Sequence, residues 1–218
     1  TDDRGVSLTL SELFVSIQGE GSAQGRPCAF VRLTGCPLRC RWCDTGYARE
    51  GGVQTTVEAV VEQVVAHSVP LVEITGGEPL AQSETPRLAQ ALLDAGLEVL
   101  CETSGALDIG ALPPGVGRVM DLKAPSSGET DRMLWSNVDR LTPRDDVKIV
   151  CADRADYEWA RAVIRDHDLA AHARVVLTAA TPHLAPADLA DWIVADRLPV
   201  RLQVQLHKVL WPDEDRGR

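Results

Sequence analysis

The hydrophobic positions of this chain fall into short runs that alternate between the period of a strand and that of a helix. Residues 8–17 alternate loosely, and apolar runs of strand length predict strands over 28–33, 71–75, 98–102, 118–123, 146–151, 174–178 and 201–206. Apolar positions spaced three and four apart predict helices over 57–65, 84–95, 153–168 and 186–197. Thr55 and Glu58 form a capping-box pattern before the first helix, and Gly96 is a C-cap for the second.

This alternation predicts parallel strands joined by right-handed crossovers. Polar residues follow the carboxyl ends of several predicted strands, where barrels and open α/β sheets place their ligands. The 218 residues are fewer than the roughly 250 of a full eight-unit barrel, and segments 103–117 and 124–145 carry weak helical signals or none. We therefore predict the α/β class, as a partial, open TIM-like (β/α) barrel in one domain over 1–218.

Composition narrows the class of protein. Apolar residues make up 44% and charged residues 25% of the chain, as in ordinary globular proteins. The formal net charge of −10 disfavours a phosphate backbone, so we expect no direct contact with nucleic acid. We find no eighteen-residue apolar run and no signal-peptide pattern, and therefore expect no membrane segment and a cytoplasmic location.

Three cysteines, Cys36, Cys40 and Cys43, are spaced as C-x3-C-x2-C. Four-iron clusters take four thiolates, so three would leave one iron open to a small molecule. Gly35 and Pro37 favour a loop here rather than a helix. The other three cysteines lie singly in apolar runs, where we expect small buried side chains rather than disulfides.

Two alternatives remain for the clustered cysteines. Cys-x2-Cys is also a common half of a zinc site, which would need a fourth ligand from Cys28, Cys101, Cys151 or a distant histidine. The three thiols would also share one face of a helix, if a helix ran through them, and would then be core residues.

Further polar residues stand where ligand contacts are expected. Arg32 is a charge inside an apolar run, which is costly unless it has a partner, and arginine grips carboxylates with two hydrogen bonds. Gly76 and Gly77 follow a predicted strand and would let a ligand approach the backbone, or form a plain turn. Asp44 and Thr45 follow the last cysteine and suit Mg²⁺, or cap a helix.

The cysteine spacing, together with Thr75-Gly76-Gly77-Glu78-Pro79, resembles the radical S-adenosylmethionine (SAM) superfamily. Within it, the stretch from Glu12 to Gly21 looks like the E-x-F-x-x-x-Q-G-E-G segment of 7-carboxy-7-deazaguanine synthases. The match continues through residues 25–27, 30–32, 35–36, 42–45, 75–79, 102–105, 121–123 and 205–208.

The resemblance implies a SAM-dependent ring contraction of 6-carboxy-5,6,7,8-tetrahydropterin to 7-carboxy-7-deazaguanine with loss of ammonia, a step toward the deazapurine of queuosine in tRNA. It implies a [4Fe-4S] cluster, SAM that is regenerated, and Mg²⁺ as cofactors. It also implies an external electron donor of the flavodoxin or ferredoxin type and a homodimer.

The resemblance also carries residue roles. It implies cluster ligation by Cys36, Cys40 and Cys43, with Thr45 on Mg²⁺. The SAM contacts that it implies are Trp42, Cys43, Asp44, Gly77, Glu102, Ser104, Asp121 and Lys123, with Glu102 on the ribose hydroxyls and Lys123 on the SAM carboxylate. The substrate contacts are Ile17, Gln18, Gly19, Arg32 and Thr75, and the catalytic residues are Arg32, Glu20 and His207. The substrate-binding segment is 8–26, and the tail 209–218 departs from the family pattern.

Two other functions fit part of this pattern. A glycyl-radical activase is a short radical SAM enzyme that acts on a protein, and it would not need Gln18 to Gly21 or Arg32. A non-catalytic zinc or iron–sulfur module would need a fourth protein ligand for its metal.

Overall fold

The computed structural model describes residues 7–214, 216 and 217. Its nine strands form one open, twisted sheet with the order β3-β1-β2-β4-β5-β6-β7-β8-β9. The strands are β1 (Leu8–Ile17), β2 (Pro27–Leu33), β3 (Val53–Thr55), β4 (Leu71–Gly76), β5 (Glu98–Thr103), β6 (Gly117–Leu122), β7 (Asp146–Cys151), β8 (Arg174–Ala179) and β9 (Arg201–Gln203). The α-helices are α1 (Val57–Ala66), α2 (Thr85–Asp94), α3 (Arg154–Asp166), α4 (Leu169–His172), α5 (Pro186–Asp196) and α6 (Leu206–Leu210).

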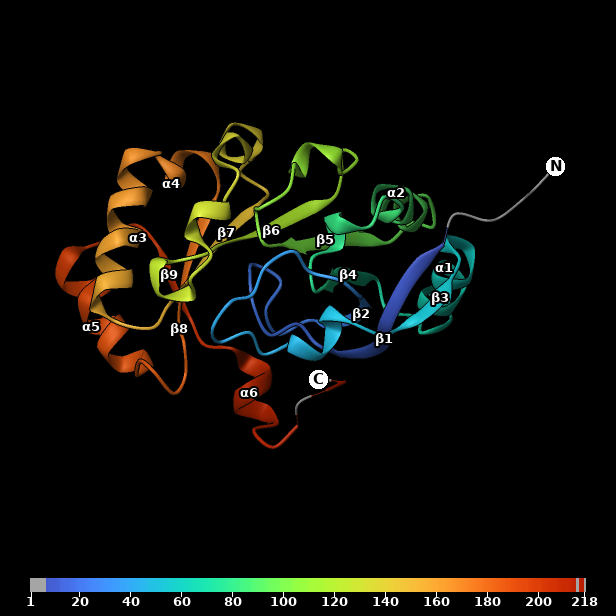
Figure 1. The fold of residues 1–218 in the computed structure, drawn as a ribbon, viewed down its shortest axis with the longest axis horizontal. Helices are drawn as coiled ribbons and strands as arrows, with labels where there is room; N and C mark the ends of the chain where they lie inside the picture. The colour runs from blue at the N-terminus through green and yellow to red at the C-terminus, as the bar shows by residue number, and fades with distance from the viewer. Residues whose placement is uncertain (1–6, 215, 218) are drawn as a thin grey trace.

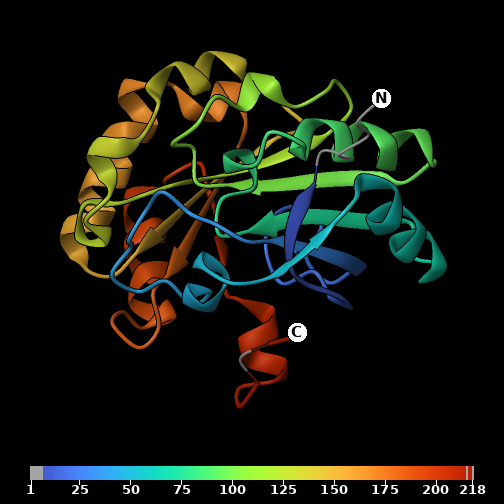
Figure 2. The same cartoon turned by 45° about the vertical axis from the view of Figure 1, so that its right-hand side comes forward.

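All neighbouring strands from β2 to β9 run parallel, as the alternating pattern predicts. The sheet curves and the larger helices lie along its outer side, while α6 projects away from them (Figures 1 and 2). The partial barrel is therefore confirmed, and the cysteine loop follows β2, its first parallel strand.

The core has two main clusters on the helix side of the sheet. Helices α1 and α2 cover one, through residues such as Val60 and Leu88. Helices α3 and α5 cover the other, through Tyr157 and Leu189. Cys28, Cys101 and Cys151 are fully buried and unpaired, which confirms the expectation of small core side chains.

The structure differs from the sequence prediction in short elements. The predicted strand 201–206 ends at Gln203, and the five-residue helix α6 begins at Leu206. Thr55 is not a helix cap, because it pairs with Leu8 across β3 and β1 and leaves that role to Thr56. Helix and strand signals need several repeats, which elements of three to five residues do not provide.

Segments 103–117 and 124–145 contain only 3₁₀ turns among their helical residues, in agreement with their weak signals. The fully buried Asn137 holds these turns together. Its side chain accepts a hydrogen bond from the backbone N of Ile109 and donates to the backbone oxygens of Gly105 and Leu107. A side-chain amide thus satisfies backbone groups that a regular helix would pair. Among the described residues, no helix is long and apolar enough to cross a membrane.

Candidate active site

One cavity at the carboxyl ends of the parallel strands collects every site residue that the sequence indicated. Its lining includes Ile17, Gln18, Gly19, Glu20, Arg32, Cys36, Cys40, Trp42, Cys43, Asp44, Thr45, Thr75, Gly77, Glu102, Ser104, Asp121, Lys123 and His207. It also includes Glu73, Lys148 and Lys208, to which no sequence motif assigned a role. Glu73 and Lys148 carry the same signal as Arg32, a single charge in the middle of an apolar strand, and that signal could have found them.

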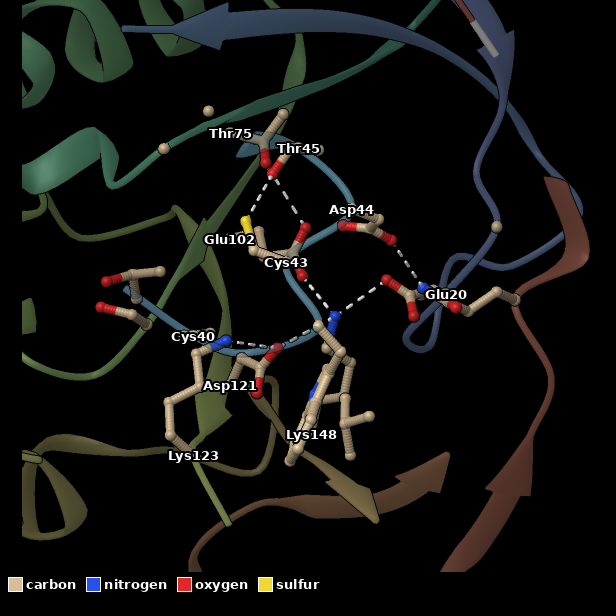
Figure 3. Close-up of a pocket in the computed structure, with 18 of the residues that line it drawn as sticks. Glu20, Cys40, Cys43, Asp44, Thr45, Thr75, Glu102, Asp121, Lys123 and Lys148 are labelled. Atoms are coloured by element: carbon tan, nitrogen blue, oxygen red, sulfur yellow. Dashed lines mark hydrogen bonds and ion pairs between the residues drawn. The ribbon is translucent and has the colours of Figure 1, made fainter. Parts of the chain in front are cut away.

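The cysteine loop is held by the side chain of Arg39 within it and by a neighbouring turn. The Arg39 guanidinium donates to the backbone oxygens of Cys36 and Leu38 at 2.7 and 2.8 Å. The backbone N of Arg41 donates to the oxygen of Ser127 at 3.1 Å. Cys36 and Cys40 are half-buried and Cys43 is exposed to the cavity (Figure 3). Burial raises the pKa of the Cys36 and Cys40 thiols, so binding a metal cluster there would release their protons.

The glycine pair after β4 packs the end of this strand against the cysteine loop. A Cβ on Gly77 would lie 2.3 Å from the backbone oxygen of Gly35, and one on Gly76 would lie 2.1 Å from that of Leu33. The backbone N of Glu78 donates to the oxygen of Gly35 at 2.7 Å. These glycines therefore allow backbone to approach backbone, at the place where the loop leaves β2.

Glu78 joins this turn to the end of β5. Its buried carboxylate accepts hydrogen bonds from the Thr103 hydroxyl at 2.8 Å and from the backbone N and the hydroxyl of Ser104 at 2.7 and 2.5 Å. The Ser104 hydroxyl is thus bound to Glu78, although Ser104 lines the cavity. Because its hydrogen is donated to Glu78, this hydroxyl can contact a ligand only as an acceptor.

Arg32 lies on β2 with one side of its guanidinium fixed. Its Nε donates to Glu12 Oε1 at 2.7 Å, and the Tyr47 hydroxyl donates to the same oxygen at 2.6 Å. Phe14 and Tyr47 place their rings about the guanidinium, with centroids 5.9 and 6.0 Å from its carbon. Among the described residues the two terminal nitrogens have no hydrogen-bond partner, which leaves them for a ligand.

The loop after β1 carries both buried and ligand-facing groups. The Gln18 side chain donates to Glu73 and accepts from the backbone N of Glu20 at 3.1 Å, so it shapes the turn. Burial, together with repulsion from Glu102 and Glu20, raises the pKa of Glu73 well above its ordinary value. Gly19 lets His207 approach, since a Cβ there would lie 2.4 Å from His207 Nδ1.

Buried charges fill the floor of the cavity. Lys148 on β7 binds Glu20, Glu102 and Asp121, and Asp121 also binds Lys123 at 3.0 Å (Figure 3). Glu102 accepts in addition from the Thr75 hydroxyl at 3.4 Å. Four parallel strands, β4 to β7, thus bring one polar side chain each to the same place.

Asp44 and His207 both line the cavity, and the partners of Asp44 are the residues on either side of Leu206 and His207. The Asp44 carboxylate pairs with Lys208 at 2.9 Å and accepts from Gln205 at 3.4 Å. Loss of hydration would raise the pKa of Asp44, but Lys208 outweighs it and lowers the pKa to about 2. Burial lowers the pKa of His207. Thr45 stands at the start of a 3₁₀ turn and makes no side-chain cap, which removes the support for the capping alternative.

The three thiols face a common cavity and agree with ligation of a cluster that leaves an open position. A closed zinc site would need a fourth protein ligand. The other cysteines, Cys28, Cys101 and Cys151, are buried in strands and do not line the cavity. The three clustered cysteines lie outside any α-helix, so the helical-face alternative is wrong.

An open, parallel barrel with three cysteines in the loop after its first parallel strand defines a radical SAM protein, and the model of the Radical SAM superfamily matches residues 30–123. The chain is 45% identical to the 7-carboxy-7-deazaguanine synthase of Chlorobaculum tepidum, over 96% of this chain and 97% of that protein. It is 40% identical to that of Koribacter versatilis, over 96% of this chain and all of that protein. This chain belongs to the 7-carboxy-7-deazaguanine synthase family.

A solved structure supports the same fold. QueE from Escherichia coli superposes with a TM-score of 0.77 at 22% identity, over 92% of this chain and 95% of that chain. SuiB from Streptococcus suis is more distant, with a TM-score of 0.59 at 14% identity, and this chain covers 48% of it. The likeness to both is one of fold.

Proposed function

We propose that this chain converts 6-carboxy-5,6,7,8-tetrahydropterin to 7-carboxy-7-deazaguanine with loss of ammonia, in the pathway to queuosine. The observation that carries the proposal is Arg32. The cavity that presents three cysteines for a cluster also presents a partly buried guanidinium, whose terminal nitrogens have no hydrogen-bond partner among the described residues. A planar guanidinium of this kind grips a carboxylate with two hydrogen bonds, and both the substrate and the product carry one.

Each group of residues has a part in this reaction. Cys36, Cys40 and Cys43 would hold a [4Fe-4S] cluster, and SAM would lie against the residues that the resemblance indicated. When bound, the cluster and SAM supply the one-electron chemistry that starts the rearrangement. Glu12 and Tyr47 hold Arg32 in place for the substrate carboxylate. Gly19 and Glu20 line the cavity where the nitrogen-rich edge of the pterin would lie.

His207 is placed to hold or move a proton at Nδ1, close to the backbone of Gly19. Because burial lowers its pKa, the ring is neutral at physiological pH and can accept a proton from the substrate or from a water.

The proposal includes a Mg²⁺ ion with Thr45 as a protein ligand. The protein offers few oxygen ligands here, because Asp44 is paired with Lys208. Mg²⁺ commonly keeps several waters and takes substrate oxygens, so one or two protein ligands are enough. A homodimer and an external flavodoxin-like or ferredoxin-like electron donor complete the proposal.

The test is an anaerobic assay with mass spectrometry. Protein reconstituted with iron and sulfide receives SAM, Mg²⁺, a reductant and the pterin, and we expect 7-carboxy-7-deazaguanine in excess over enzyme. Arg32→Lys should lower kcat/KM by about 10- to 100-fold, the loss of one charge-assisted hydrogen bond. Arg87→Lys is the matched control, because the Arg87–Glu58 pair is exposed and outside the cavity.

Other outcomes would contradict parts of this proposal. Cleavage of SAM with an untouched pterin would keep the superfamily and reject the substrate. Full conversion of the pterin by Arg32→Lys would reject the role of Arg32 and leave the proposed reaction in place. A preparation that retains zinc and forms no cluster would contradict the ligand assignment itself.

A further inference from the structure

Lys148 is the most highly connected charge in the cavity, and neither the sequence pattern nor the family resemblance assigned it a role. It lies in the middle of β7 with 5% of its surface exposed. Its Nζ lies 2.8 Å from Glu20 Oε2, 2.5 Å from Glu102 Oε1 and 3.3 Å from Asp121 Oδ2 (Figure 3). These carboxylates come from the loop after β1, from β5 and from β6.

The ammonium group is charged despite its burial. Burial alone would lower the pKa of Lys148, but Glu102, Glu20 and Asp121 outweigh it and raise the pKa well above its ordinary value. Removing one partner from a buried ion pair leaves an uncompensated charge, so these four side chains depend on one another. Without Lys148 the three carboxylates would repel each other and separate.

Two of the carboxylates that Lys148 binds use only one of their two oxygens in hydrogen bonds or ion pairs with described residues. Among the described residues, Glu20 Oε1 and Asp121 Oδ1 are buried and have no hydrogen-bond partner. A buried acceptor without a partner is costly, and one that lines a cavity is explained by a ligand that donates to it. Lys148 therefore fixes two acceptors, one from the substrate loop and one from the parallel sheet.

Strand β7 also fixes the loop that carries Glu20. Asp146 and Lys148 are two residues apart, so their side chains leave the same face of the strand. Asp146 Oδ2 accepts from the backbone N of Ser22 at 2.8 Å, while Lys148 binds Glu20. Two side chains of β7 thus fix the position of this loop over the cavity.

We propose that Lys148 is a positioning residue that aims Glu20 at an N–H donor on the edge of the substrate and holds Glu102 and Asp121 toward the cofactor side of the cavity. This inference rests on the proposed function for the identity of the substrate. Lys148 acts through the carboxylates, and its ammonium group is itself saturated by them.

The test measures binding without turnover. Reconstituted holoenzyme is kept oxidised with SAM present, and the dissociation constant of the pterin is measured by calorimetry for wild type, Lys148→Met, Glu20→Gln and the double variant. We expect Lys148→Met to weaken pterin binding at least tenfold. In the Glu20→Gln background the same change should weaken it less than threefold, because the group through which Lys148 acts is already altered.

A matched control separates positioning from folding. Arg118 pairs with the buried Asp145 at the opposite end of the sheet from the cavity, so Arg118→Met also removes a partly buried cation from an ion pair. It should lower thermal stability and leave the dissociation constant within twofold of wild type. A parallel series with Glu102→Gln and SAM as the titrant tests the cofactor side.

Three results would overturn the inference. Lys148→Met could leave the dissociation constants unchanged, Lys148 and Glu20 could act additively, or Arg118→Met could weaken binding as much as Lys148→Met. A wild type that binds no pterin would overturn the proposed function together with the inference. A wild type that binds it, with additive effects in the variants, would overturn this inference alone.

Discussion

Glu73 shows how burial and neighbouring charges act on the pKa of a single residue in this cavity. It lies on β4 with 3% of its surface exposed and accepts a hydrogen bond from Gln18. The nearby cation Lys148 already binds three other carboxylates. Burial and repulsion from Glu102 and Glu20 therefore raise the pKa of Glu73 well above its ordinary value and favour the neutral acid.

This state predicts a dependence of stability on pH. A carboxyl whose pKa is raised on folding binds its proton more tightly in the folded state, so stability falls as pH rises above the ordinary value of 4.5. Each pH unit in that window costs at most about 1.4 kcal/mol. Glu73→Gln keeps the neutral shape and should remove this slope, so that the variant matches wild type near pH 5 and is more stable at pH 8.

Thermal unfolding at several pH values under anaerobic conditions measures the effect. Glu62→Gln, on the exposed surface of α1, is the control and should follow the wild-type profile. Parallel profiles for wild type and Glu73→Gln would show that folding does not raise the pKa of Glu73.

At the scale of single residues, the sequence located cavity residues where one position carried a strong signal. The cysteine spacing and Arg32 are such positions, and the cavity contains them. The sequence did not predict pairings such as that of Lys148 with Glu20, 128 residues apart. Those contacts depend on the order of strands in space, which a local pattern does not specify.

Among the elements, the turn after β4 is the one on which the cysteine loop depends. Gly77 has no room for a side chain, since its Cβ would meet the backbone of Gly35 and the Cβ of Cys36. The turn at Gly77 thus packs directly against the cysteine loop and also lines the cavity.

Gly77→Ala should therefore displace the cysteine loop. We expect a loss of about 1–3 kcal/mol in stability, as for other overpacked sites, and a reduced iron and sulfide content after reconstitution. Gly96→Ala is the control, because a Cβ there meets open space and only the positive φ of 83° opposes it. It should cost about 1–2 kcal/mol and leave the cluster content unchanged. Wild-type iron content in Gly77→Ala would show that the packing at Gly77 does not position the cysteine loop.

The elements themselves were predictable where they are long. Helices α1, α2, α3 and α5 have ten or more residues, and their apolar spacing located each of them. The strand β3 and the helix α6 have three and five residues. Such short elements form because neighbours in the fold complete their hydrogen bonds, as Leu206 does by donating to the oxygen of Gly19.

For the whole molecule, the alternation of strands and helices predicted a parallel, incomplete barrel, and it did not show how the open side is bridged. β1 pairs with β2 on one side and β3 on the other, both antiparallel, and the sheet stays open between its edge strands β3 and β9. Side-chain amides bridge the gap instead. Gln24 donates to the backbone oxygens of Gly19 and Val204 at 2.8 and 2.9 Å.

Gln203 makes the most complete of these bridges. Its Oε1 accepts from the backbone N of Gly21 at 2.8 Å, and its Nε2 donates to the backbone oxygen of the same residue at 2.6 Å. The amide thus imitates one step of a β-ladder between the loop after β1 and β9. Because the loop also carries Glu20, this bridge connects the closure of the barrel to the cavity.

Gln203→Ala should open that connection without unfolding the protein. Two hydrogen bonds of about 0.5–1.5 kcal/mol each would be lost, so amide exchange in residues 19–24 and 204–207 should accelerate by about tenfold or more at 1.4 kcal/mol per factor of ten. KM for the pterin should rise, because the loop is less well placed, while exchange in α1 stays unchanged. Gln63→Ala, on the exposed face of α1, is the control and should affect neither region. Unchanged exchange in the loop of Gln203→Ala would show that Lys148 and Asp146 hold it without the bridge.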